Sequence, residues 1–128
     1  MLDTDVSVEV IRGRGEHLQT YKSRRLVISA ITRYELRVGA EKADNRKAKR
    51  RTKRFLNNIE VLEFGPAAAD RSGTVRARLE KVGNSIGPYD YLIAGHALST
   101  GCAVLTANVD EFRRVRGLEV LRWHPTRA

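Results

Sequence analysis

Short apolar runs of strand length recur along the chain and alternate with stretches that carry apolar residues at helical spacing. The runs are rich in Val, Leu and Ile, and they cover residues 1–2, 26–31, 61–64, 102–106 and 118–123. Several are continuous rather than alternating, which is typical of strands buried on both faces of a parallel sheet. Strands that alternate with helices predict an α/β fold connected by right-handed crossovers.

The segment VSVEV, residues 6–10, admits two interpretations. It alternates apolar and polar residues like a strand, yet Val6, Val10 and Ile11 also fall on one face of a helix. Because residues 1–2 already form a predicted strand, the next element should be a crossover. We therefore predict a helix here, and Gly13 supplies its stop signal.

Length and composition fit one domain. The chain has 128 residues, 41% of them hydrophobic, which is enough for a core without disulfides or a structural metal, and we predict a single domain over 1–128. The only cysteine, Cys102, lies in the apolar run CAVLT, and we predict that it is buried. A lone cysteine allows no intramolecular disulfide and favours a reducing, cytoplasmic setting. No leader and no apolar run of about 20 residues are recognisable, so we expect a soluble protein without a membrane segment.

The charge of the chain indicates what kind of partner to expect. The chain carries 24 Lys and Arg against 15 Asp and Glu, a formal net charge of +9. Such a surplus favours a polyanionic partner, because each neutralised phosphate releases condensed counterions. A nucleic acid or an acidic protein partner is the expectation, and an inert basic surface is the alternative.

Acidic and amide side chains follow several of the predicted strands. Asp3 stands at the end of the first strand, and Glu35 lies four residues past the run 26–31. Asn108, Asp110 and Glu111 come just after the run 102–106. In open parallel α/β sheets, ligands bind outside the carboxyl ends of the strands. The predicted fold therefore gathers these groups along one edge.

Asp90 joins them from the segment GPYDYLIAGHAL, residues 87–98. A Gly-Pro turn leads into a predicted helix with Asp90 in its first turn, and apolar residues nearly surround that helix. We therefore expect the helix to be buried against the sheet. At about 100° per residue, Ala94 and Ala97 lie near the face of Asp90, whereas His96 points away and is expected to be structural.

Taken singly, each acid has a structural interpretation. Asp90 would offset a helix dipole, and Asp3 would be an exposed terminal residue. Glu35 would complete a capping box in TRYE with Thr32 as the N-cap. Asp110 and Glu111 would cap the turn NVDEF.

Taken together, the acids favour a metal site. Several carboxylates at one sheet edge repel each other and raise each other's pKa values, and a hard divalent cation removes that conflict. Mg²⁺ prefers oxygen ligands and commonly uses one or two carboxylates together with phosphates. An acidic metal site in a basic chain suggests phosphodiester chemistry, in which the metal activates water and stabilises charge on the phosphate.

Four blocks of the sequence resemble the PIN-domain ribonuclease toxins of VapC type, the enzyme halves of bacterial toxin–antitoxin pairs. The blocks are MLDTD (1–5), ISAITRYELRVGAEK (28–42), GPYDYLIAGHAL (87–98) and LTANVDEFRRVRGLEV (105–120). They cover nearly the whole chain in order. The residues of these blocks are most similar to the subgroup that cleaves initiator tRNA in the anticodon region.

The resemblance implies a fold, an activity and partners. The fold is a PIN-like three-layer α/β/α domain with a central, mainly parallel sheet of four to five strands. The activity is a Mg²⁺- or Mn²⁺-dependent endoribonuclease that acts on RNA and so inhibits translation. The partners are a second copy of the chain in a homodimer and a cognate VapB-type antitoxin whose tail enters the active-site groove.

The family's site residues transfer to this chain position by position. The resemblance implies Asp3, Glu35 and Asp90 as catalytic, metal-binding acids. At the variable fourth position this chain has Asn108, a weaker neutral ligand, and Glu111 is the expected fourth acid.

Two positions depart from the family's pattern. Relatives usually read LDTN, whereas this chain has Asp5, and an ionised Asp accepts hydrogen bonds without donating them. Relatives in the subgroup also read TNN where this chain has Ala107. Asp5 either adds charge that tightens metal binding or displaces Asp3, and the sequence leaves both open.

The run RKAKRRTKR, residues 46–54, holds seven basic residues in nine. Like charges at i,i+4 oppose helix formation, so an anion should offset them. RNA phosphates are the first expectation, with contacts from Arg50, Arg51 and Arg54, and acidic residues of the antitoxin are the second. Such contacts position a backbone and read no sequence.

Two other classes of function remain alternatives. One is an RNA-binding PIN module whose site is weak or inactive through Asp5 and Asn108. The other is a receiver-like signalling domain that uses a strand-end aspartate, against which the charge of +9 argues. Tyr89 and Tyr91 flank Asp90, and they either stack on a base or pack at the rim.

Overall fold

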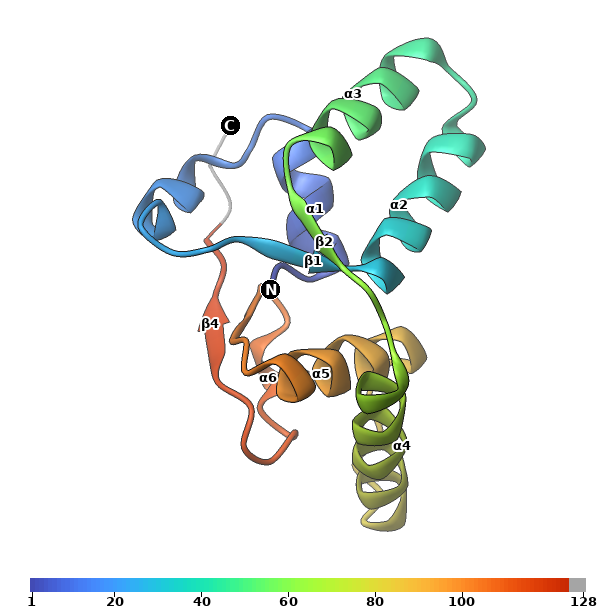
Figure 1. The fold of residues 1–128 in the computed structure, drawn as a ribbon, viewed down its shortest axis with the longest axis vertical. Helices are drawn as coiled ribbons and strands as arrows, with labels where there is room; N and C mark the ends of the chain where they lie inside the picture. The colour runs from blue at the N-terminus through green and yellow to red at the C-terminus, as the bar shows by residue number, and fades with distance from the viewer. Residues whose placement is uncertain (125–128) are drawn as a thin grey trace.

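The computed structural model describes residues 1–124 (Figure 1). Its helices are α1 (Thr4–Ile11), a 3-10 helix η1 (Glu16–Tyr21), α2 (Ala30–Ala43), α3 (Arg46–Asn57), α4 (Pro66–Lys81), α5 (Pro88–Thr100) and α6 (Val109–Phe112). Its strands are β1 (Val27–Ser29), β2 (Glu60–Leu62), β3 (Val104–Thr106) and β4 (Val120–Arg122). The predicted helix over 6–10 is therefore confirmed as α1.

All strand pairing is parallel. β1 pairs with β2, β3 pairs with β4, and a parallel bridge from Leu2 to Leu105 links the chain start to β3. The Leu2 amide donates to the Val27 carbonyl at 2.9 Å, so residues 1–3 lie between β1 and β3. The predicted first strand is thus a single bridge, and the two strand pairs meet through it. The predicted count of four to five strands in one sheet is not confirmed in that form.

Neighbouring residues of the central segments point to opposite sides and build two separate cores. Met1, Val27 and Val104 pack in one cluster with residues of α4, α5 and α6. Leu2, Ile28 and Leu105 pack in the other with residues of α1, α2 and α3. This alternation is the period of two that a strand imposes. The result is the expected three-layer α/β/α arrangement (Figure 1).

Two helices begin at the carboxyl ends of the central segments, and each is capped by the residue that ends its segment. The Asp3 carboxylate accepts from the Val6 amide, which caps α1. Ser29 caps α2 through the Ile31 amide. The predicted capping box is therefore wrong, because the helix begins before Thr32, whose side chain is buried. The interpretation of Asp3 as an exposed end is wrong as well, since it is 4% exposed.

The basic run forms helix α3 despite its charge repulsion. Asn45 caps the helix through the Ala48 amide, and Thr52 and Leu56 anchor its buried face. Lys49 lies 3.6 Å from Glu41 of α2, which offsets part of the charge. The packing of one apolar stripe therefore outweighs the unfavourable i,i+4 pairs.

Helices α4 and α5 pack closely because Gly95 lets them approach. A Cβ at Gly95 would lie 2.1 Å from the Ser72 hydroxyl oxygen and 2.4 Å from the Ser72 amide nitrogen. Ser72 is itself buried and donates to the Ala68 carbonyl. This contact fixes α5, and with it the position of Asp90 in its first turn.

Trp123 and Cys102 differ in burial. Trp123 is 3% exposed and packs against His17. Cys102 packs against the core beside Thr100 but is only half-buried, so its predicted burial is wrong. Within residues 1–124, no helix is long and apolar enough to cross a membrane.

Candidate active site

The three predicted metal-binding acids and Asp5 line one cleft at the carboxyl ends of the central segments. The cleft has a volume of about 220 Å³ and is lined by Asp3, Thr4, Asp5, Glu35, Gly87, Pro88, Tyr89 and Asp90. Its residues come from the start of α1, the first half of α2 and the start of α5. The parallel topology therefore brings together acids that lie up to 87 positions apart, as the sequence predicts.

Asp3 is the most firmly held of these acids. One carboxylate oxygen accepts from the Val6 amide at 2.9 Å, and the other accepts from the Thr106 hydroxyl at 2.5 Å. Burial raises the pKa of Asp3 to about 6, although both hydrogen bonds act to lower it. Each carboxylate oxygen has its own hydrogen-bond donor, so the side chain has one defined position.

Glu35 is oriented by the hydroxyl of Thr4, which donates to its carboxylate at 2.6 Å. Burial raises the pKa of Glu35, and the negative charge of Asp5 adds to the increase. Asp5 is exposed and stands at the rim of the cleft. Its charge also raises the pKa of Asp3, by less than burial does.

The carboxyl groups of Asp90 and Glu111 share a hydrogen bond. Burial raises the pKa of Asp90 to about 7, and a hydrogen bond with Glu111 and the charges of Asp3, Glu111 and Glu35 contribute to the increase. The side-chain amide of Asn108 donates to the Glu111 carboxylate at 2.6 Å and so orients Glu111. Gly87 leaves room for this carboxylate, because a Cβ at position 87 would lie 2.9 Å from an Asp90 carboxylate oxygen.

The donor set suits a hard divalent cation. Within the described part of the chain, no three His, Cys, Asp or Glu side chains form a ready metal-binding group. Mg²⁺ does not need one, since it keeps several waters and uses one or two carboxylates. Burial raises the pKa values of Asp3 and Asp90, and the charges of neighbouring carboxylates add to both increases, so a bound cation would relieve both effects. These oxygen donors therefore fit Mg²⁺.

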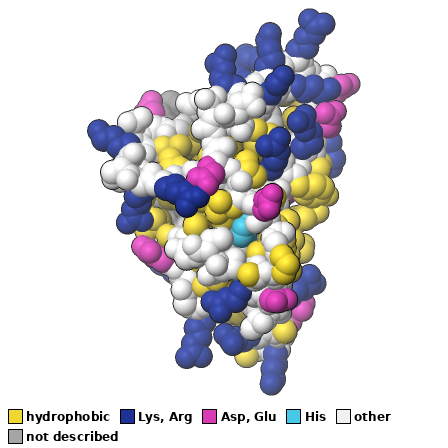
Figure 2. Space-filling view, in the orientation of Figure 1, with side chains coloured by type: hydrophobic (Ala, Val, Ile, Leu, Met, Phe, Trp, Pro, Cys, Tyr) yellow, Lys and Arg dark blue, Asp and Glu magenta, His cyan; other side chains and the backbone are white. Residues whose placement is uncertain are grey.

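Other predicted residues lie outside the cleft. Arg50 and Arg54 are exposed on α3, and Arg51 lines a separate groove between α1, α2 and α3. Figure 2 shows Lys and Arg side chains over α3 at the top of the view. His96 is buried, bonds to the Ser29 hydroxyl at 2.7 Å and has a pKa lowered by burial, in keeping with a structural role.

The two tyrosines beside Asp90 have different surroundings. Tyr91 is buried, and its hydroxyl accepts from the Ile86 amide at 3.1 Å. Tyr89 is 42% exposed at the cleft and stands beside Tyr34, with ring centroids 5.9 Å apart. Tyr91 therefore packs in the core, and only Tyr89 has a ring available at the rim.

Sequence reasoning missed two hydroxyl groups that organise the site. Thr4 holds Glu35, and Thr106 holds Asp3 while also accepting from the Asn108 amide. The one available signal was position, because Thr4 adjoins Asp3 and Thr106 ends a buried apolar strand at the same edge. A polar residue at the carboxyl end of such a strand indicates a site.

Comparisons with known proteins agree with this geometry. The family model described as PIN domain matches residues 1–118. The chain is 38% identical over 130 residues to the tRNA(fMet)-specific endonuclease VapC of Salmonella typhimurium, with 96% of each protein covered. It is 35% identical to the protein of the same name from Shigella flexneri, also with 96% of each covered.

Solved structures give the same picture of the fold. The DNA-bound VapBC structure from Salmonella typhimurium matches with a TM-score of 0.85 and 37% identity, covering 97% of each chain. VapBC2 from Rickettsia felis, bound to a DNA fragment from its promoter, matches with a TM-score of 0.89 and 28% identity. That match covers 97% of this chain and 98% of the other.

Proposed function

The chain belongs to the PIN-domain family and, within it, to the VapC ribonucleases, and from this premise we propose that it is the toxin of a toxin–antitoxin pair. Its proposed activity is Mg²⁺-dependent hydrolysis of RNA phosphodiester bonds, which inhibits translation. The proposed substrate is tRNA, and initiator tRNA first, because two relatives at 35–38% identity are named for that activity. The observation that carries the proposal is the cleft lined by Asp3, Glu35 and Asp90.

We propose that Asp3 and Asp90 hold the cation and that Glu35 and Glu111 support it. A bound Mg²⁺ would supply activation of a water molecule and neutralisation of charge on the scissile phosphate. Asp3 presents a fixed carboxylate because the Val6 amide and the Thr106 hydroxyl orient it. Glu35 is fixed by Thr4 in the same way.

The Asp90 carboxyl group holds a proton near neutral pH. Its pKa is about 7, so it retains that proton when most carboxyl groups are ionised. A bound cation would require the ionised form, so binding would be weaker at low pH. Asp90 lines the cleft, where its carboxyl group can take a proton from, or return it to, a reacting group.

The basic surface would bind the substrate backbone. The exposed arginines Arg50 and Arg54 on α3 are proposed phosphate contacts, with Arg51 beside them. The acidic cleft and the basic surround then have separate tasks, because one holds a cation and the other holds a polyanion.

The antitoxin is the proposed protein partner, and a homodimer is the proposed assembly. The relatives in the solved structures are VapBC complexes. A groove of about 270 Å³ between α1, α2 and α3 runs from Glu35 to Arg51 and is lined by apolar residues that include Val8, Ile11 and Leu36. An apolar segment of the antitoxin in this groove would reach the cleft. A single domain and a cytoplasmic location remain predictions.

Incubation of the purified protein with initiator tRNA tests the proposal. We expect cleavage in the anticodon region with Mg²⁺ and none with EDTA, measured by sequencing the RNA ends. A total tRNA pool lacking the initiator is the matched control for substrate choice. Binding of tRNA that survives EDTA without cleavage under Mg²⁺ or Mn²⁺ would instead identify an inactive RNA-binding module.

A further inference from the structure

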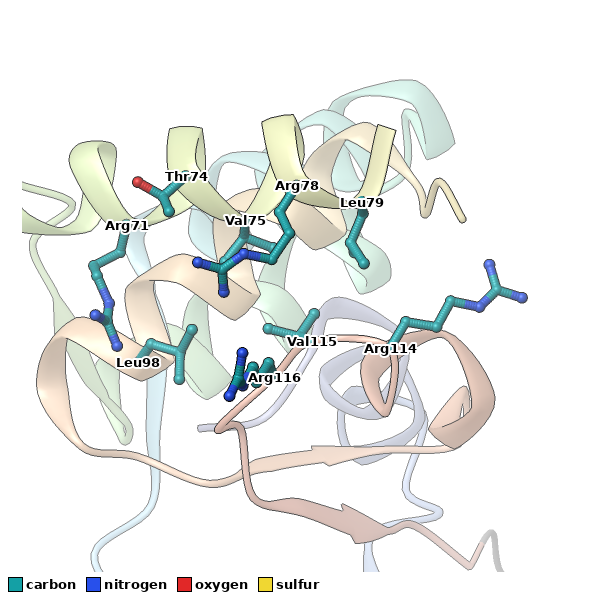
Figure 3. Close-up of a pocket in the computed structure, with 9 residues that line it drawn as sticks. All are labelled: Arg71, Thr74, Val75, Arg78, Leu79, Leu98, Arg114, Val115 and Arg116. Atoms are coloured by element: carbon teal, nitrogen blue, oxygen red, sulfur yellow. The ribbon is translucent and has the colours of Figure 1, made fainter. Parts of the chain in front are cut away.

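A second pocket, lined by arginines, lies away from the acids. It occupies about 90 Å³ between α4, the end of α5 and the turn that follows α6 (Figure 3). Val75, Leu98 and Val115 form its apolar floor, and Thr74 adds a hydroxyl group at its edge. None of the acids of the cleft lines this pocket.

Three guanidinium groups converge on this pocket from two elements. Arg71 and Arg78 lie seven residues apart on α4, two helical turns, and therefore share a face. Arg116 comes from the turn after α6 and points toward them, whereas Arg114 points away (Figure 3). This arrangement is an arginine pocket made by Arg71, Arg78 and Arg116.

The arginine pocket is not neutralised by the protein. Among residues 1–124, no ion pair joins Arg71, Arg78 or Arg116 to a carboxylate. Arg76, on the same helix, differs, because it lies 3.3 Å from Glu80 and covers the Tyr91 ring. Three like charges around one pocket repel each other unless an anion lies between them.

The chemistry and the size of the pocket fit a phosphate group. Guanidinium groups bind phosphate oxygens through paired, charge-assisted hydrogen bonds, and the apolar floor strengthens these contacts by excluding water. A volume of about 90 Å³ corresponds to roughly three waters, which is room for one phosphate group.

The pocket lies within reach of a strand that occupies the catalytic cleft. Leu98 is eight residues from Asp90 along α5, a separation of about 12 Å at 1.5 Å per residue. Arg114 ties the turn that carries Arg116 to the segment before α5, because its guanidinium donates to the Ser85 carbonyl at 2.8 Å. The turn also follows directly on α6, which supplies Glu111.

We propose that the arginine pocket binds a backbone phosphate of the RNA substrate, a few nucleotides from the bond that is cut. This inference rests on the proposed ribonuclease function and adds a positioning site to it. The contact is independent of sequence, and it would fix the register of the strand in the cleft. Carboxylates of an acidic protein are the competing ligand, and binding of tRNA by pocket variants separates the two.

The test compares tRNA binding by two double variants in an Asp90→Asn background, which prevents cleavage. Arg71→Ala/Arg116→Ala removes two of the pocket's charges. We expect weaker binding and a plot of log affinity against log salt that is less steep by about 0.7, because the pocket holds one phosphate and each lost phosphate contact removes about 0.7. Between 50 and 200 mM salt, the parent should then lose about 2.6-fold more affinity than the variant.

The charge-matched control is Lys81→Ala/Arg113→Ala, which removes two exposed charges from α4 and from the end of α6. It should keep the parental salt slope, and melting curves should show both variants folded. In the cleaving protein, the pocket variant should raise KM for initiator tRNA and leave kcat unchanged.

Three results separate the possibilities. Unchanged tRNA binding, KM and salt slope in the pocket variant would overturn the inference even if the parent cuts tRNA. Unchanged tRNA binding together with lost inhibition by the antitoxin would assign the pocket to an acidic protein, which also overturns it. If the parent protein binds tRNA without cutting it, and the pocket variant loses that binding, the result would support the pocket as a phosphate site and refute the ribonuclease function.

Discussion

At the scale of single residues, the site depends on hydroxyl groups as much as on acids. Thr106 donates to Asp3 and accepts from the Asn108 amide, so one side chain connects β3, α1 and the start of α6. The hydrogen bond lowers the pKa of Asp3, although burial keeps that pKa at about 6. Removal of the Thr106 hydroxyl should therefore change the pKa of Asp3 while the Asp3 side chain stays the same.

Thr106→Val should move the acid limb of the pH–activity profile to higher pH. Without its donor, Asp3 becomes harder to ionise, so its pKa rises further. The protein should also lose about 1–3 kcal/mol of stability, because the buried Asp3 carboxylate loses a hydrogen bond. The checks are kcat/KM against pH and chemical unfolding. Thr100→Val, which removes a hydroxyl at the far end of α5, is the control and should leave the profile in place.

Asp5→Asn should move the same limb in the opposite direction. The charge of Asp5 raises the pKa values of Asp3 and Glu35, so its removal lets both acids ionise at lower pH. Because Asp5 is exposed, screening should keep the shift below about one pH unit. The profile of kcat/KM against pH measures it, with exposed Glu16→Gln as the control. An unchanged profile would mean that the second acid of MLDTD is incidental.

The sequence predicts the acids of the cleft better than their supports. Asp3, Glu35 and Asp90 could be placed because strand ends in a parallel sheet meet at one edge. The contacts of Thr4 and Thr106 depend on side-chain directions and distances of 2.5–2.6 Å, which no periodicity encodes. Asp3 was mistaken for a possible exposed end because its burial comes from neighbours far along the chain.

At the scale of elements, the crossing of α4 and α5 positions the catalytic edge. Asp90 stands in the first turn of α5, and the helix is held by its close contact with Ser72 of α4. A helix that is buried nearly all round has no freedom to shift without opening the core. Changes at this crossing should therefore affect stability first and the cleft second.

Gly95→Ala should destabilise the protein by about 1–3 kcal/mol or more, because the new methyl group would overlap the Ser72 backbone. Gly73→Ala is the matched control on α4, since nothing lies within 4 Å of a Cβ at that position. The control should be neutral or stabilising by about 0.5–1 kcal/mol. Urea unfolding of both variants measures the difference. Equal stability of the two would show that the crossing is looser than described.

Element types follow from the sequence more closely than their ends. The helix at α1 and the buried helix α5 could be predicted, because apolar spacing and chain order indicate them. The start of α2 was misplaced, since Ser29 and Thr32 are both good N-caps and only packing decides between them. The predicted first strand is only a bridge at Leu2 in the structure, because this short segment pairs through few hydrogen bonds.

At the scale of the whole molecule, an acidic cleft lies within a basic body. Dark blue side chains gather over α3 and around the lower end of the view in Figure 2, where Figure 1 places the end of α4. The net charge of +9 draws in a polyanion, while the cleft draws in a cation. This balance should make stability depend jointly on pH and on Mg²⁺.

Without Mg²⁺, stability from Asp3 and Asp90 should fall as pH rises from about 4 to about 7. Both acids have folded pKa values, about 6 and about 7, above the ordinary value of 3.8, so the folded state binds more protons in that window. Mg²⁺ requires the ionised acids, so it should raise Tm more at pH 8 than at pH 5. Thermal melts with and without Mg²⁺ check this, and an equal increase at both pH values would argue against these ligands.

The most direct test of the central claim, that the acids of the cleft carry out RNA cleavage, compares Asp90→Asn with Asp70→Asn. Asp70 is exposed on α4, so its variant makes the same chemical change away from the cleft. Under single-turnover conditions with Mg²⁺ and initiator tRNA, Asp90→Asn should be slower by about 10²–10⁴-fold, and Asp70→Asn should match the parent. Full activity of a folded Asp90→Asn protein would contradict the account.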